Sequence, residues 1–177
     1  MHARERGSGG FSLLEVGIAL AIIAILSVLA LAGASQLRAR AQRIKCANNL
    51  RNLAVAANLY LEQNGSWPQI RRNSVAEPQA YAQAWIDALT PFGATREIWI
   101  CPTIQGLLNN PDYSTAETAR VDYVATPFDD RPGSPREWVR QPWFIERGNV
   151  HGKGNLVIFT DGSVQDLKTV LNEAKKR

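Results

Sequence analysis

The most unusual reactive group in this sequence is a carboxylate inside an apolar segment. Glu15 is the one ionisable side chain within residues 11–37. A charged side chain at the centre of a bilayer costs about 2.5–3.5 kcal/mol even on a mild insertion scale, so it requires a partner. No lysine or arginine lies within one helical turn of Glu15. We therefore expect an ion pair with a cation that the segment's own side chains do not provide.

The two cysteines, Cys46 and Cys101, are the next reactive groups. In an exported domain such a pair is compatible with one disulfide, which would join the globular part to the helix that precedes it. In the chain-entropy model, closing a loop of this length stabilises the fold by about 4 kcal/mol. The alternative is two separated thiols. Zinc is not indicated, because a structural site needs about four ligands and the chain holds two cysteines and two histidines without a zinc-binding spacing.

His151 and the pair Asp161-Gly162 stand ten positions apart. A functional interpretation is a contact between histidine and aspartate, or a metal ligand near a hairpin. The structural interpretation is stronger: Asp161 opens a turn, Gly162 takes a positive φ, and His151 packs where the chain enters the sheet.

Asp129 and Asp130 are weak candidates for calcium, which takes about six to eight oxygen ligands, but their spacing matches no defined calcium loop. The sequence has no nucleophile elbow, and its two histidines give little basis for acid–base catalysis. We therefore expect neither enzyme activity nor a cofactor.

The segment that carries Glu15 predicts a helix that continues beyond a membrane. Residues 11–37 would span about 40 Å, against about 30 Å for a hydrocarbon core. A helical apolar spacing continues through Leu50, Leu53 and Leu61 to the breaker Asn64-Gly65. We expect one helix over residues 11–63, about 80 Å long, with its transmembrane part at about residues 11–37.

The start of this segment carries a known pattern. Gly10-Phe11-Ser12-Leu13-Leu14-Glu15 resembles the type IV prepilin processing motif. The resemblance implies a leader over residues 1–10, cleavage between Gly10 and Phe11 by prepilin peptidase, and N-methylation of Phe11. It also implies that Glu15 pairs with the Phe11 amine of a neighbouring subunit in a filament.

Two further blocks resemble the prepilin-type H-x9-D-G proteins: the stretch from Cys46 to Trp67-Pro68, and the closing block with His151, Asp161 and Gly162. The resemblance implies a pilin-like fold and a structural subunit of a type II secretion pseudopilus or a type IV pilus-like filament. Its partners would be other pilin or pseudopilin subunits and an inner-membrane assembly platform. It would be a single-pass protein of the bacterial inner membrane with an exported C-terminal domain, and then part of a periplasmic or surface filament.

Two alternatives remain at this point. The first is a minor pilin in adhesion, motility or DNA uptake. The second is a membrane-tethered binding module that uses a pilin-type anchor, whose mark would be a polar pocket with perturbed carboxylates.

Five basic residues follow the apolar segment before the next acid, Glu62, and they are Arg38, Arg40, Arg43, Lys45 and Arg51. No aromatic residue interrupts this run, so a solvated or headgroup-facing surface fits better than a nucleic-acid site. The positive-inside rule would place the run in the cytoplasm. The processing motif implies the reverse orientation, and we follow the motif because prepilin peptidase cuts on the cytoplasmic face.

The remaining residues, 64–177, predict a globular α+β domain. We expect helices over residues 78–89 and 169–176, and strands over 97–101, 121–125 and 138–147. Pro142 restricts the last of these strands to a sheet edge or a bulge. Residues 155–167 predict a hairpin closed by Asp161-Gly162 as a two-residue turn, which would pair Phe159 with Val164.

Overall fold

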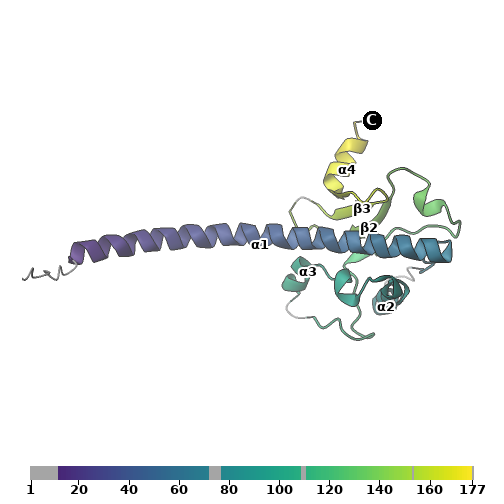
Figure 1. The fold of residues 1–177 in the computed structure, drawn as a ribbon, viewed down its shortest axis with the longest axis horizontal. Coiled ribbons are helices and arrows are strands. Elements are labelled where there is room, and N and C mark those ends of the chain that lie inside the picture. Colours follow the sequence, from purple (N-terminus) through teal and green to yellow (C-terminus); the bar gives the residue numbers. More distant parts are fainter. Residues whose placement is uncertain (1–11, 72–76, 109–110, 153, 177) are drawn as a thin grey trace, which may run out of the picture. The chain divides into compact units, whose positions relative to one another are not determined.

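The structure is a computed structural model that describes residues 12–71, 77–108, 111–152 and 154–176, apart from the side chains of residues 30–33. The chain separates into two compact units, Met1–Arg38 and Ala39–Arg177. One helix, α1 (Leu13–Asn64), contributes to both units (Figure 1). The helix predicted for residues 11–63 is therefore confirmed over its described length, and its end lies one residue further on.

The part of α1 that belongs to the first unit is apolar and exposed. Leu13 is 93% exposed, and the described apolar side chains that follow it are also open to solvent. Glu15 lies in the first turn of the helix. The hydroxyl of Ser27 donates to the carbonyl of Ile23 at 2.7 Å, which satisfies this polar group within the helix. By length and composition this segment is a candidate single membrane span.

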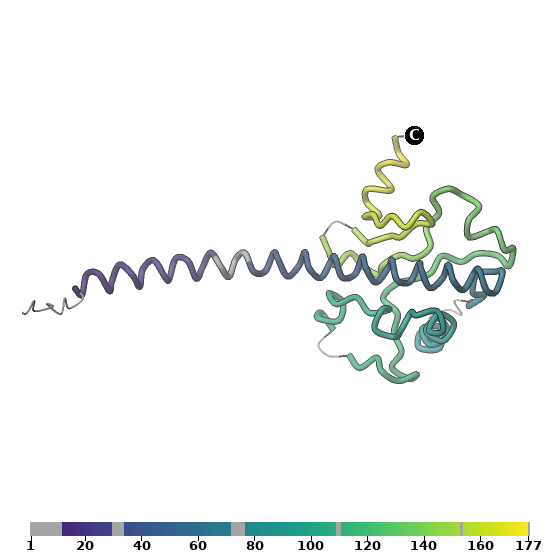
Figure 2. Tube along the Cα trace, in the orientation of Figure 1, coloured from purple at the N-terminus to yellow at the C-terminus, as the bar shows by residue number. Residues whose placement is uncertain are grey.

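The second half of α1 buries one face in the core of the Ala39–Arg177 unit. Buried side chains recur with helical spacing at Cys46, Leu50, Leu53, Ala57 and Leu61. Figure 2 shows this half of the helix within the globular unit, where these residues join the core cluster. Helix α1 ends at the predicted breaker, Asn64-Gly65. Gly65 has φ +72° and donates its N–H to the carbonyl of Leu61 at 2.9 Å, which caps the helix.

Four antiparallel strands form one sheet in the order β1-β2-β3-β4. They are β1 (Tyr123–Ala125), β2 (Pro142–Glu146), β3 (Leu156–Phe159) and β4 (Val164–Asp166). All four residues of β3 are buried, so both faces of this strand are covered. Strand β2 lies inside the sheet, and its register shifts between Pro142 and Phe144. Of the two positions predicted for Pro142, a sheet edge or a bulge, the structure therefore has the bulge.

The hairpin β3–β4 forms where it was predicted, but the predicted register is wrong. Val164 pairs with Ile158 rather than with Phe159. The loop is one residue longer than expected: the N–H of Gly162 donates to the carbonyl of Phe159 at 2.9 Å, and the N–H of Phe159 donates to the carbonyl of Ser163 at 3.0 Å. Gly162 takes φ +76°, as a three-residue turn with a glycine bulge requires.

The helix predicted for residues 78–89 is confirmed as α2 (Pro78–Leu89), whereas the strand predicted for residues 97–101 is wrong. That segment is mostly a 3-10 helix, because the N–H groups of Ile98 and Ile100 donate to carbonyls three residues earlier. The remaining helices are η1 (Thr90–Phe92), η2 (Arg96–Trp99), α3 (Pro102–Leu107), η3 (Ser134–Arg136) and α4 (Leu167–Ala174).

A cluster of aromatic side chains fills the centre of the core. The ring of Trp67 lies 5.1 Å from that of Phe128, 5.3 Å from that of Trp143 and 5.6 Å from that of Phe144, measured between ring centroids. Trp85 of α2 lies 6.0 Å from Trp67 and joins this helix to the same group. The contacts of Trp67 with Phe128 and Trp143 are edge-to-face, and such contacts stabilise the core in addition to the burial of apolar area. The α+β class predicted from the sequence is therefore confirmed for the described residues.

Candidate functional site

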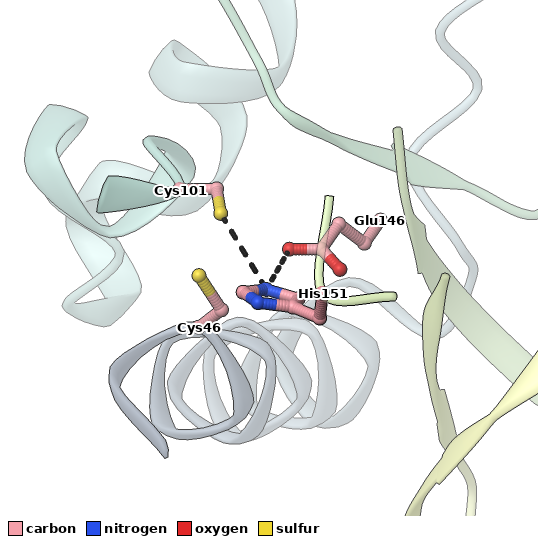
Figure 3. Close-up of side chains that lie close together, drawn as sticks. All are labelled: Cys46, Cys101, Glu146 and His151. Atoms are coloured by element: carbon pink, nitrogen blue, oxygen red, sulfur yellow. Dashed lines mark hydrogen bonds and ion pairs between the residues drawn. The ribbon is translucent and has the colours of Figure 1, made fainter. Parts of the chain in front are cut away.

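Four metal-ligating or titratable side chains meet inside the Ala39–Arg177 unit (Figure 3). They come from different parts of the chain: Cys46 from α1, Cys101 from the segment before α3, Glu146 from the end of β2, and His151 from the loop between β2 and β3. One ligand atom of each lies within 4.8 Å of those of the other three. We call these four residues the Cys-Glu-His cluster.

The cluster is closed to solvent. Cys46 and Cys101 are fully buried, and the side chains of Glu146 and His151 are 0% and 3% exposed. A carboxylate in such a place is stable only where hydrogen bonds or cations replace its water.

Glu146 is held by groups on both of its carboxylate oxygens. The Nε2 atom of His151 lies 3.1 Å from Oε1, and the N–H of Leu156 donates to Oε2 at 3.3 Å. The register of the sheet places Glu146 opposite Tyr123 on β1. The Nδ2 atom of Asn155 donates to the Glu146 carbonyl at 2.8 Å and fixes the end of the strand.

The buried carboxylate of Asp122 positions Cys101. Its backbone N–H donates to Asp122 Oδ2 at 2.8 Å. Asp122 is also paired with Arg120, whose Nε lies 2.9 Å from Oδ1. Burial raises the pKa of Asp122, although the Cys101 N–H and the guanidinium of Arg120 act in the opposite direction.

The two thiols influence each other. The hydrogen bond with Cys101 lowers the pKa of Cys46 to about 7, because it stabilises the thiolate form, while burial acts against it. The same hydrogen bond, together with burial, raises the pKa of Cys101. Burial likewise raises the pKa of Tyr123, and the neighbouring Cys46 adds to this effect.

The structure brings together the two cysteines that the sequence paired, and both are free thiols in it. The disulfide stays a prediction that the structure does not test. The structure also adds a histidine to the pair, since the Nε2 atom of His151 lies 3.9 Å from Cys101 Sγ.

The two parts of the H-x9-D-G pattern have separate surroundings. Asp161 lies in the β3–β4 turn, where its Oδ1 accepts the N–H of Ser163 at 2.8 Å. Hydrogen bonding to the Ser163 side chain, with a smaller effect of this N–H, lowers the pKa of Asp161. Among the described residues, the carboxylate that contacts His151 is Glu146 rather than Asp161. Asp161 and Gly162 therefore lie in the turn as expected, with Gly162 at positive φ, but Thr160 rather than Asp161 opens the loop, and His151 packs in the cluster.

The other predicted site residues lie elsewhere. Asp129 is paired with Arg131, whose Nε lies 2.7 Å from Oδ2, on an exposed loop that also holds Asp130. Calcium at this pair of aspartates stays a prediction. Glu15 is exposed in the first unit. Gly10 and Phe11, where cleavage is predicted, lie outside the described residues.

Glu146 is the cluster residue that the sequence reasoning missed. The signal was present in the alternation of β2, because Phe144 and Glu146 share one face of the strand and Phe144 is apolar. An acid on the strand face that enters the core requires a partner, so this alternation marks Glu146 as a candidate site residue.

An apolar hollow of about 520 Å³ opens on another part of the same unit. Its lining is mainly aromatic and aliphatic, as at Trp67, Ile70, Tyr81 and Phe128, and includes Arg71. No carboxylate is among the described residues that line it.

Comparison of the chain with models of protein families, with curated proteins and with solved structures finds no match. The interpretation of the two units therefore rests on the residues themselves.

Proposed function

We propose that this chain is a pilin-like structural subunit of a type II secretion pseudopilus or a type IV pilus-like filament. The observation that carries the proposal is the construction of α1. Its first half is exposed and apolar with one acid, Glu15, in the first turn, and its second half forms part of a globular core. A solitary membrane anchor would need only the first of these halves.

Assembly follows from the properties of this helix. In the membrane, the apolar side chains of residues 13–29 contact lipid. In a filament, contacts between helices replace these lipid contacts. Gly17 allows close approach of a neighbouring helix, because an added Cβ there would have no described atom within 4 Å outside the adjacent backbone of its own helix. Glu15 then pairs with the amine of Phe11 on the next subunit, and the need to neutralise this carboxylate sets the axial register.

Maturation precedes assembly in this proposal. Prepilin peptidase cuts between Gly10 and Phe11, which creates the amine, and Phe11 is then N-methylated. The C-terminal unit is exported across the inner membrane, and an assembly platform in that membrane adds the subunit to the filament. A minor pilin would share all of these steps and differ only in its place within the filament.

Glu15→Ala tests the proposal in cells that carry the filament system. We expect normal removal of residues 1–10 and normal amounts of protein in the membrane, with a loss of the subunit from sheared filaments. Glu62→Ala is the matched control, because Glu62 is an exposed acid on the same helix outside the apolar segment. Normal incorporation of the Glu15→Ala subunit would overturn the assembly role.

Mass spectrometry of the native N-terminus provides the second readout. A chain that begins with N-methylated Phe11 and is found in sheared filaments supports the proposal. A chain that keeps its first ten residues and stays dispersed in the membrane would overturn it. The alternative of a tethered binding module stays open, because a smaller hollow lined by Trp138, Trp143 and Thr160 also includes Asp161, a carboxylate whose pKa is lowered.

A further inference from the structure

We propose that the Cys-Glu-His cluster is a structural zinc site, with Cys46, Cys101, Glu146 and His151 as its four ligands. Zinc was not indicated by the sequence, because that reasoning counted cysteines and histidines and left out Glu146. The fold provides the fourth ligand. It brings together donors from three distant parts of the sequence, at residues 46, 101 and 146–151.

The distances fit a tetrahedral ion. With Zn–S bonds of about 2.3 Å and Zn–N and Zn–O bonds of about 2.0 Å, a sulfur and a nitrogen lie about 3.5 Å apart, and a nitrogen and an oxygen about 3.3 Å apart. The corresponding distances here are 3.9 Å from Cys101 Sγ to His151 Nε2 and 3.1 Å from His151 Nε2 to Glu146 Oε1. No two of the four donors are more than 4.8 Å apart, so small inward movements complete the site.

Both of these contacts are made by the same nitrogen of His151 (Figure 3). One N–H cannot point at two acceptors at once with good geometry. A cation between the thiols, the carboxylate and Nε2 bonds to all four donors once the two thiols have released their protons to solvent. It also gives a direct partner to a carboxylate whose side chain has no exposed surface.

The groups around the cluster are those that a metal site needs in its outer shell. The N–H of Leu156 holds the far oxygen of Glu146, and Asp122 holds the backbone of Cys101. The hydroxyl of Tyr123 is fully buried and is hydrogen-bonded to the side chain of Cys46. A thiolate on Cys46 is a stronger acceptor for this hydroxyl than a thiol.

The donor set selects the class of metal. Two thiolates, an imidazole and one carboxylate oxygen in a tetrahedral arrangement favour zinc, whereas calcium and magnesium take oxygen ligands in larger numbers. Four protein ligands leave no open position, so the site is structural and not catalytic. Its effect is to join the second half of α1 to the segments around residues 101, 146 and 151.

The test uses the full-length chain without an affinity tag, in detergent micelles, after reduction and treatment with a chelator. We expect the protein to bind one equivalent of zinc and to unfold at a higher temperature with zinc than without it. Cobalt in place of zinc should produce the intense visible bands of a tetrahedral ion and a thiolate-to-cobalt charge-transfer band. Absence of tight binding of one equivalent, or a cobalt spectrum without thiolate bands, would overturn the proposal.

Variants assign the ligands. Cys101→Ser should remove the charge-transfer contribution of one thiolate, and Glu146→Gln should weaken binding. Glu137→Gln is the matched control because Glu137 is exposed on the surface, so its zinc affinity should equal that of the unchanged protein. Unchanged affinity in both Cys101→Ser and Glu146→Gln would overturn the assignment. The spectrum of the unchanged protein remains decisive if a ligand variant does not fold.

Tyr123→Phe tests the outer shell, because it removes only the hydroxyl. Loss of an outer-shell partner typically weakens a metal site about 10- to 100-fold, with the same ligands retained. We therefore expect weaker zinc binding with an unchanged cobalt spectrum. A disulfide between Cys46 and Cys101 in protein isolated from cells without reductant, detected by thiol labelling and mass spectrometry, would overturn the zinc proposal outright.

Discussion

His151 pairs with Glu146, five residues earlier in the chain, at 3.1 Å between Nε2 and Oε1. Both side chains are buried in the core. Asp161, which follows His151 at the spacing that made the pattern visible, lies instead in the β3–β4 turn. The conspicuous spacing in the sequence therefore marks two separate structural roles.

We predict that Glu146→Gln destabilises the metal-free protein by about 1–3 kcal/mol. The carboxylate accepts from the Leu156 N–H on one oxygen and faces His151 with the other. Glutamine keeps a single oxygen, so a buried donor loses its acceptor. Urea unfolding of the chelator-treated chain in micelles measures the effect, with Glu137→Gln as the exposed control. Equal stability of the two variants would show that the Glu146 contacts contribute nothing.

We predict that Gly162→Ala destabilises the fold by about 1–2 kcal/mol, because a Cβ disfavours the left-handed conformation. Gly162 has φ +76°, and an added Cβ would meet no other atom within 4 Å, so the effect is purely conformational. Gly106→Ala is the matched control. Gly106 lies in α3 with equally open space, and alanine there should be neutral or stabilising by up to about 1 kcal/mol. Thermal unfolding that moves both variants in the same direction would contradict this account of the turn.

The burial of one face of α1 predicts a contrast between two neighbouring positions. Leu53→Ala should cost about 2–5 kcal/mol, because Leu53 is fully buried and its removal leaves a cavity. Val55→Ala should change the stability by less than about 0.5 kcal/mol, because Val55 is 59% exposed on the opposite side. Unfolding curves of the two variants measure this difference. Similar losses of stability at both positions would contradict the burial of the Leu53 face of α1.

Asp122 predicts a specific pH dependence. Burial raises its pKa in the folded state, so the folded chain binds this proton more tightly than the unfolded chain. Stability is then lost as the pH rises from the unfolded pKa, about 4, through the raised folded pKa. The Asp122→Asn variant lacks an ionisable side chain at this position. Its free energy of unfolding should therefore decrease less over this pH range than that of the unchanged protein. Unfolding free energies measured across the acid range give the two slopes, and identical slopes would contradict the prediction.

Processing makes a prediction outside the described residues. If prepilin peptidase cuts after Gly10 as proposed, Gly10→Val should abolish removal of residues 1–10, because the cut requires a small residue with a flexible backbone. The uncut chain should migrate more slowly on a gel and retain its leader mass. Gly7→Val changes a leader glycine away from the cut and should mature normally. Normal maturation of Gly10→Val would remove the basis for the proposed assembly step.

Local signals in the sequence determined several elements correctly. The helical spacing of apolar residues and the glycine after Asn64 set the course and the end of α1. Pro78 and the following apolar spacing set α2. Pro142 limited its strand to a sheet edge or a bulge, and the structure has the bulge. These signals succeed because the backbone restrictions of proline and glycine, and the period of a helix, act within a few residues.

Only the tertiary structure decided the β3–β4 register, the 3-10 helix at residues 96–99 and the Cys-Glu-His cluster. A hairpin register depends on how each strand face packs, and a short apolar segment follows the partners that surround it. The cluster needs residues 46, 101, 146 and 151 to meet. Their meeting depends on long-range packing of α1 against the loops, which no local spacing in the chain encodes.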